Sequence, residues 1–228
     1  MTTAFPPGPL GILGGTFDPI HLGHLRLGQE ALQQLGLSQI RFIPAGRPPL
    51  RDSPCASAQQ RLAMVKLAIA GNPEFVVDDS EALAATQSYT VDTLTRLRTE
   101  LGPQRAMVLL LGGDAFARLE SWQRWTEIFS LAHVAVATRP DSANSTIDTK
   151  IGDRQVEYTP ALAREFQQRL GTVVDIAKSP SGRIFPFTIP ALEISATAIR
   201  QQIKSGRLPR YLVAEAVVRY IELNHLYR

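Results

Sequence analysis

The stretch LGGTFDPIHLGHL, residues 13–25, joins an apolar run to a segment of helical period. Residues 10–13 read as a buried strand, and leucines at helical spacing predict a helix over 22–35 that Gly36 closes. In a parallel sheet, ligands collect where the carboxyl end of a strand meets the next helix. The quoted stretch occupies the first such position in this chain.

Two residue types in this stretch suit a phosphate. Gly14 and Gly15 allow close approach of the backbone, and the N-terminus of the following helix attracts an anion. His21 and His24 share one helix face and can donate hydrogen bonds to a transferring phosphoryl group. Each histidine alone is more often a packed or solvated residue. The combination is what indicates a phosphate site.

The exact form of this site is not one of the common nucleotide motifs. The stretch contains neither the G-x-G-x-x-G dinucleotide fingerprint nor a P-loop. Asp18 followed by Pro19 fits an N-cap and first helical residue, although the period also allows the helix to start near Leu22.

The rest of the chain alternates short apolar runs with helical periods, which is typical of an α/β fold with a doubly wound parallel sheet. We expect strands at 10–13, 40–43, 75–77, 107–111, 134–137 and 184–187, and helices at 22–35, 58–70, 90–101 and 122–129. The polar residues 139–159 read as a surface excursion. After Pro190 the pattern is helical, so we expect a core over 1–190 and a small C-terminal helical subdomain over 191–228, together forming one functional domain.

A second motif, ISATAIR, begins that C-terminal segment at residue 194. Ser195 is the expected N-cap and Gly206 the expected end of a helix. Arg200 and Lys204 then lie one turn apart on one face, where an arginine near a helix N-terminus suits the β- and γ-phosphates of a nucleotide. Standing alone, this segment would read as a capped surface helix with two solvated cations.

The two motifs together resemble the H-x-G-H and I-S-S/A-T-x-I-R signatures of the nucleotidyltransferase superfamily, whose fold is Rossmann-like and shared with class I aminoacyl-tRNA synthetases. The resemblance implies that His21, His24 and Arg200 are catalytic and contact the phosphates of ATP. The other ATP-binding residues that it implies are Gly14, Gly15, Thr16, Phe17, Gly23, Ser195 and Thr197.

Over residues 11–228 the chain is similar to bacterial nicotinate mononucleotide adenylyltransferases, which transfer AMP from ATP to nicotinate mononucleotide and give deamido-NAD and pyrophosphate. The matching elements are FIPAGRPPLR (42–51), RLAMVKLAI (61–69), SYTVDTL (88–94), LGGDAF (111–116), SWQRW (121–125), ATRP (137–140) and the ending VVRYIELNHLYR. The implied mononucleotide-binding residues are Trp122 on the pyridine ring, Asp114 at a ribose hydroxyl, Tyr89 and Thr90 beside the nicotinate group, and Arg51 and Arg139 at the phosphate.

Two positions depart from the pattern of that family. The family usually has P-P-H-[KR], and Leu50 replaces the histidine here, so a polar contact to substrate is missing or comes from Arg47. Ala45 lies where the family often has asparagine. Taken alone, Trp122 would fit a core position as well as a stacking role.

The resemblance implies a reaction without a covalent intermediate, because the phosphate of nicotinate mononucleotide is already a nucleophilic anion. Catalysis consists of bringing two polyanions together and offsetting their repulsion during in-line attack on the α-phosphorus. We expect Mg²⁺ to be held mainly by ATP and water rather than by protein ligands, since the sequence shows no cluster of carboxylates.

Composition limits the partners. The net charge of the 228 residues is +3 and the basic residues are scattered, so no nucleic-acid surface is expected, and no apolar run is long enough for a membrane span. The single cysteine, Cys55, fits a reducing compartment, and the prediction is a cytoplasmic enzyme that binds ATP and nicotinate mononucleotide. A homo-oligomer stays open.

Several alternatives stay open at this point. Nicotinamide mononucleotide differs from the nicotinate form only by an amide in place of a carboxylate. A pantetheine-phosphate adenylyltransferase shares the histidine motif, but such chains are shorter and lack SYTVDTL and SWQRW. A nucleotide-binding regulator would not need both intact motifs, and a class I synthetase fragment lacks its K-M-S-K-S-like stretch here.

Overall fold

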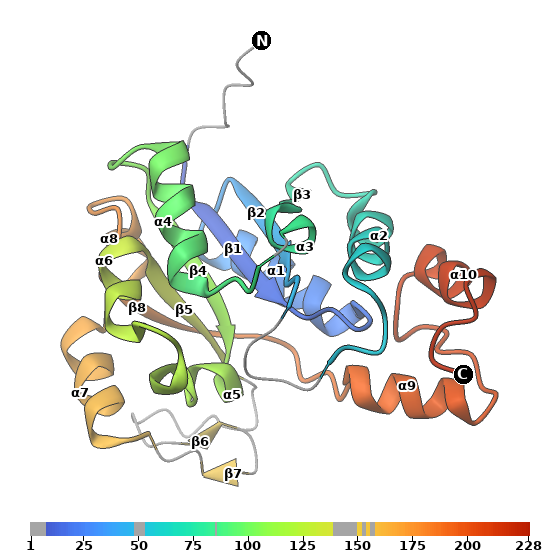
Figure 1. Cartoon of the computed structure of the whole chain (residues 1–228). Helices are drawn as coiled ribbons and strands as arrows, with labels where there is room; N and C mark the ends of the chain where they lie inside the picture. The colour runs from blue at the N-terminus through green and yellow to red at the C-terminus, as the bar shows by residue number, and fades with distance from the viewer. Residues whose placement is uncertain (1–7, 48–52, 85, 139–149, 152–153, 156–157) are drawn as a thin grey trace. The chain divides into compact units, whose positions relative to one another are not determined.

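A computed structural model of the chain describes residues 8–47, 53–84, 86–138, 150–151, 154–155 and 158–228. Its centre is a six-stranded parallel sheet with the strand order β3-β2-β1-β4-β5-β8 (Figure 1). The order reverses between β1 and β4, as in other doubly wound folds. The expected α/β class is confirmed.

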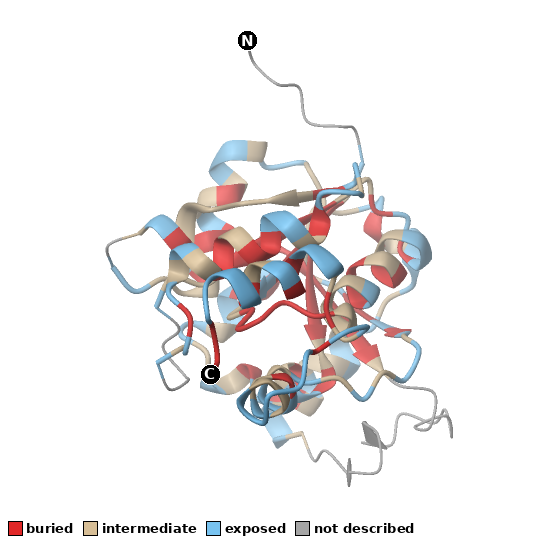
Figure 2. Ribbon diagram, turned by 90° about the vertical axis from the view of Figure 1, so that its right-hand side faces the viewer, coloured by how far each residue is buried: buried red, intermediate tan, exposed pale blue. Residues whose placement is uncertain are grey.

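All six expected strands are present. They are β1 (Leu10–Gly15), β2 (Gln39–Pro44), β3 (Phe75–Val77), β4 (Met107–Gly112), β5 (His133–Thr138) and β8 (Ile184–Thr188). Five consecutive residues of β2, of β4 and of β5 are buried. Figure 2 shows the buried residues in red. Unbroken apolar runs of this kind are typical of parallel strands covered on both faces by helices. A short antiparallel pair, β6 (Lys150–Ile151) with β7 (Arg154–Gln155), lies within the expected surface excursion.

The helices follow the predicted periods in most places. They are α1 (Leu22–Gln34), α2 (Ala58–Ile69), α3 (Ser80–Leu83), α4 (Thr90–Leu101), α5 (Gly113–Phe116), α6 (Ile128–Leu131), α7 (Pro160–Arg169), α8 (Val173–Ile176), α9 (Ala196–Lys204) and α10 (Glu215–Leu223), with 3₁₀ turns η1 (Leu119–Ser121) and η2 (Trp125–Glu127). Among the described residues, none of these helices has the length and apolarity needed to cross a membrane.

The single helix predicted over 122–129 is wrong. Trp122 has extended backbone, and Arg124 adopts a left-handed conformation with φ of 51°, so the helical path is interrupted before η2 and α6. The sequence pattern also missed α7, which Thr159 caps and Pro160 begins. Side-chain periodicity cannot report a single left-handed residue, and α7 carries little apolar surface from which to detect it.

The chain divides into two compact units. Unit 1 comprises Met1–Leu13, Gly28–Ile40 and Tyr89–Ala191, and unit 2 comprises Gly14–Leu27, Arg41–Ser88 and Leu192–Arg228. Unit 2 therefore contains both sequence motifs, although 170 residues separate Leu25 from Ser195 in the chain. The expected division into 1–190 and 191–228 stays a prediction.

One arginine fastens α4 within unit 1. The Arg98 guanidinium donates to the carbonyl oxygens of Gly102 at 3.2 Å and Pro180 at 3.1 Å, and also to that of Leu131. Burial lowers the pKa of Arg98 from its usual value. The planar guanidinium reaches several acceptors at once, which an ammonium group cannot do.

We expect Arg98→Lys to lower the free energy of unfolding by about 3 kcal/mol, because carbonyl groups in unit 1 lose their donors. Urea denaturation followed by circular dichroism measures this. Arg96→Lys, on the exposed face of the same helix, is the matched control and should change the free energy by less than about 0.5 kcal/mol. Equal midpoints for the two variants would contradict the role given to Arg98.

Candidate active site

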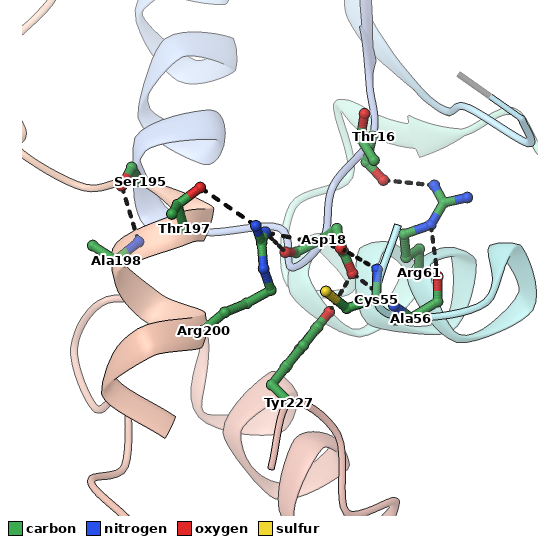
Figure 3. Close-up of polar contacts among 10 residues, drawn as sticks. All are labelled: Thr16, Asp18, Cys55, Ala56, Arg61, Ser195, Thr197, Ala198, Arg200 and Tyr227. Atoms are coloured by element: carbon green, nitrogen blue, oxygen red, sulfur yellow. Dashed lines mark hydrogen bonds and ion pairs between the residues drawn. The ribbon is translucent and has the colours of Figure 1, made fainter. Parts of the chain in front are cut away.

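The loop between β1 and α1 is held by Asp18, which does not cap the helix. The Asp18 carboxylate accepts hydrogen bonds from the backbone N–H groups of Cys55 at 2.8 Å and Ala56 at 3.0 Å (Figure 3). The N-cap interpretation of Asp18 is therefore wrong, and the alternative start of the helix at Leu22 is confirmed. The carboxylate cannot cap α1 because it already accepts hydrogen bonds from the two N–H groups that precede α2, far along the chain.

The glycines of this loop have different surroundings. A Cβ atom added to Gly14 would meet no atom within 4 Å, so the backbone is open to an approaching group. A Cβ atom on Gly15 would lie 2.9 Å from the ring of Phe17, which is buried and has a φ of 51°. That ring in turn packs edge-on against His24, with 5.0 Å between the ring centroids. Gly15 thus permits the packing that places His24.

The two histidines of the motif stack on each other. Their ring centroids are 3.7 Å apart and the planes differ by 25°. The backbone N–H of His21 donates to Nδ1 of His24 at 3.2 Å, so the proton of a neutral His24 ring is on Nε2, where it can be donated. These contacts fix the orientation of the His24 ring.

His21 is the more buried of the pair. Burial lowers its pKa to about 4, and its Nδ1 has no hydrogen-bond partner among the described residues. A Cβ atom on Gly23 would lie 3.1 Å from this nitrogen. Glycine at the third position of H-x-G-H therefore gives the His21 ring its space, and the ring is neutral at pH 7.

The second motif lies beside this loop within unit 2. The Ser195 hydroxyl accepts from the N–H of Ala198 at 3.2 Å, which confirms the predicted N-cap of α9. The helix ends before Gly206, which has a φ of 78°, as expected. Arg200 donates from Nη1 to the carbonyl oxygen of Asp18 at 2.8 Å and from Nη2 to the Thr197 hydroxyl at 3.4 Å (Figure 3). Arg200 of α9 therefore contacts residues 14–24, which run from the end of β1 to the first turn of α1 and are called the histidine loop below.

Sequence reasoning missed the arginine that supports this loop from α2. Arg61 is 1% exposed and donates to the carbonyl oxygens of Thr16 at 2.6 Å, Gly46 at 2.9 Å and Ala56 at 3.2 Å. Its pKa is lowered, mainly by burial. The available signal was the helical spacing, which puts Arg61 on the same face as the apolar Met64 and Val65.

The residues expected to bind the mononucleotide lie in unit 1 where the structure describes them. Tyr89 and Thr90 begin α4, and Asp114 is an exposed residue of α5, directly after β4. Trp122 follows η1 and is only partly buried, which does not fit a position in the core. Arg51, Arg139 and Leu50 lie outside the described residues.

An ion pair connects two of these segments. The Arg124 guanidinium contacts the Asp92 carboxylate, which joins the first turn of α4 to the loop that carries Trp122. Ala45, where the family often has asparagine, donates its N–H to the carbonyl oxygen of Gly15 at 2.9 Å. Position 45 thus contacts the loop of unit 2 through its backbone.

Within the part of the chain that the structure describes, no three His, Cys, Asp or Glu side chains come together as a ligand set. The chemistry of the histidine loop is that of hydrogen-bond donors and one guanidinium, which suits a phosphate chain.

The lowered pKa of His21 predicts a dependence of stability on pH. Because the folded state holds His21 neutral down to about pH 4, it binds fewer protons than the unfolded state below about pH 6.5. The free energy of unfolding should therefore fall as the pH decreases through this window, by up to about 3 kcal/mol from this residue.

Urea denaturation of the unaltered protein and of His21→Gln, from about pH 7 down to about pH 4, measures this contribution. The variant should lose less stability over the window than the unaltered protein. His133, whose pKa burial also lowers, contributes equally to both proteins and cancels. Parallel pH curves would show that His21 is not buried in its neutral form.

Comparison with known proteins places the chain in a family. Residues 12–202 match the family described as cytidylyltransferase-like. The relatives include proteins named "Probable nicotinate-nucleotide adenylyltransferase" from Dechloromonas aromatica, 49% identical over 96% of this chain and 98% of the relative, and from Laribacter hongkongensis, 43% identical over 99% and 97%.

Solved structures agree at the level of the fold. Plasmodium falciparum nicotinic acid mononucleotide adenylyltransferase complexed with NaAD has a TM-score of 0.67 and 17% identity, over 97% of this chain and 98% of that chain. The complex of the same enzyme with APC has a TM-score of 0.65. With both motifs in one unit and relatives of this identity over the full length, the chain belongs to the cytidylyltransferase-like family and, within it, to the nicotinate-nucleotide adenylyltransferases.

Proposed function

We propose that this protein transfers AMP from MgATP to nicotinate mononucleotide and releases pyrophosphate, which makes deamido-NAD in NAD biosynthesis. The observation that carries the proposal is the meeting of the two motifs in unit 2. Arg200 of α9 donates to the carbonyl oxygen of Asp18, in the loop that carries His21 and leads into the first turn of α1, where His24 lies. A guanidinium and two imidazoles suit the binding of a triphosphate, and here they come from motifs near opposite ends of the sequence.

The loop binds the phosphates of ATP. The open side of Gly14 admits a phosphate oxygen, and His24 donates from Nε2 because its Nδ1 already accepts from the backbone. His21 is neutral and buried, and its Nδ1, beside Gly23, has no hydrogen-bond partner in the described part of the chain. Because the His21 ring is neutral, the stacked pair avoids the repulsion that two imidazolium ions would have at this distance.

The cations act on the leaving group. Arg200 is about a quarter exposed, so its guanidinium is both anchored and accessible to the β- and γ-phosphates as pyrophosphate departs. ATP-dependent nucleotidyl transfer generally proceeds with a divalent metal on the phosphates, and we propose Mg²⁺ as that metal, bound as part of the nucleotide substrate.

The mononucleotide supplies the nucleophile. Its phosphate oxygen attacks the α-phosphorus in line, and no general base is needed because that oxygen is already ionised at pH 7. We propose that Trp122 stacks on the cationic pyridine ring, that Asp114 holds a ribose hydroxyl, and that Tyr89 and Thr90 meet the nicotinate group. Arg51 and Arg139 complete this proposal at the phosphate. The setting that we propose for the reaction is the cytoplasm.

The experiment that tests this function is pyrophosphate release from ATP and Mg²⁺ with nicotinate mononucleotide, nicotinamide mononucleotide or phosphopantetheine as acceptor. We expect strong preference for the nicotinate form. His24→Ala should lower kcat by about 10²-fold to 10³-fold, since a donor to the transferring phosphoryl group is lost.

Two results would contradict the proposal. Equal rates with the nicotinate and nicotinamide forms would remove the assigned specificity. No release with any acceptor, from folded protein that binds ATP, would favour a nucleotide-binding regulator instead.

The place of the His21 ring depends on the absence of a side chain at Gly23. Gly23→Ala should lower kcat by about tenfold or more, because the added Cβ would lie 3.1 Å from His21 Nδ1 and push the ring from its place. Gly71→Ala is the matched control, since its Cβ would meet no atom within 4 Å, and it should retain the unaltered rate. Equal kcat values for the two variants would show that this glycine does not position His21.

A further inference from the structure

The Asp18 carboxylate joins three separated segments of unit 2. It is 5% exposed, and Oδ1 accepts from the Tyr227 hydroxyl at 2.8 Å and from the N–H of Ala56 at 3.0 Å (Figure 3). Oδ2 accepts from the N–H of Cys55 at 2.8 Å. A buried carboxylate with three donors has a fixed orientation.

Tyr227 is the last residue but one, and its placement is specific. Its side chain is buried, and both His225 and Tyr227 have left-handed backbone, with φ of 52° and 64°. Such conformations are uncommon for residues other than glycine and persist where surrounding contacts impose them. Burial first, and then the neighbouring Asp18, raise the pKa of Tyr227 well above its usual value, so the hydroxyl is a proton donor at any working pH.

The fixed carboxylate lies against the arginine of the second motif. Nη1 of Arg200 is 3.8 Å from Oδ2 of Asp18 and donates to the carbonyl oxygen of the same residue at 2.8 Å. Asp18 therefore contacts Arg200 through its side chain and its backbone together. The three hydrogen bonds that Asp18 accepts partly offset its negative charge and so weaken its attraction for Arg200. The guanidinium therefore stays available to a phosphate.

We propose that Tyr227 is a positioning residue for Arg200: its hydroxyl fixes the Asp18 carboxylate, and Asp18 holds the guanidinium where the phosphates of ATP bind. The inference rests on the proposed adenylyl transfer and assigns the C-terminal end of the chain a part in it. Without the hydroxyl, the carboxylate keeps two backbone donors but has a free lone pair that competes for Arg200.

A double-mutant cycle tests the proposal. Tyr227→Phe in the full chain keeps the buried ring and should lower kcat by about tenfold, with the KM for nicotinate mononucleotide unchanged. In the Arg200→Ala background the same substitution should change kcat by less than about twofold, because the group that it positions is gone. Tyr211→Phe, at an 88% exposed tyrosine of the C-terminal segment, is the matched control and should have no effect in either background.

The affinity for inorganic pyrophosphate, measured by calorimetry over the same four proteins, gives a second cycle that needs no turnover. It should show the same loss only where Arg200 is present. Should circular dichroism show that Tyr227→Phe does not fold, Asp18→Asn tests the next contact instead: its amide nitrogen cannot accept a hydrogen bond, so the carboxylate that holds Arg200 is lost, and the same dependence on Arg200 is expected.

The outcomes separate this inference from the proposed function. Equal losses from Tyr227→Phe in both backgrounds, or no loss in either, would overturn the positioning role and leave Tyr227 a structural residue. Absence of turnover by the unaltered enzyme with ATP and nicotinate mononucleotide would overturn the proposed function, while the pyrophosphate cycle would still decide whether Tyr227 acts through Arg200.

Discussion

Burial of the Asp18 carboxylate is the constraint on which the histidine loop depends. A carboxylate that is 5% exposed costs several kcal/mol unless donors replace the water that it loses. The chain supplies these donors from the segment before α2 and from its C-terminal end. Cys55 and Ala56 lie shortly before α2, and Tyr227 lies in the turn after α10, so satisfying one side chain brings separated segments of unit 2 to the same loop.

The support continues from Asp18 to the two histidines of the motif. Arg61 donates a hydrogen bond to the carbonyl oxygen of Thr16. Phe17 is buried, has left-handed backbone, and packs its ring edge-on against His24. Under the proposed function, such support keeps the donors oriented before the nucleotide arrives, so little reorganisation is required during adenylyl transfer.

The features that could be predicted from the sequence are those that side-chain periodicity and local hydrogen bonding determine. The strands, the start of α4 at Thr90 and the Ser195 cap follow from apolar spacing and from side chains that satisfy nearby backbone groups. The sequence did not predict contacts made over long separations. Asp18 looked like an N-cap because its carboxylate would suit one, but its partners are 37, 38 and 209 residues away. No local pattern marks Tyr227. For Arg61, the only local sign of burial is that the residues one helical turn away, Met64 and Val65, are apolar.

The most direct test of this account is a crystal structure of the full chain with a non-hydrolysable ATP analogue. The account predicts a triphosphate against the backbone of Gly14 and Gly15, with hydrogen bonds from His24 and from the Arg200 guanidinium, and with the Asp18 carboxylate still bonded to Tyr227. A triphosphate bound elsewhere, or an Arg200 side chain turned away from it, would contradict the central claim that this loop binds the phosphates.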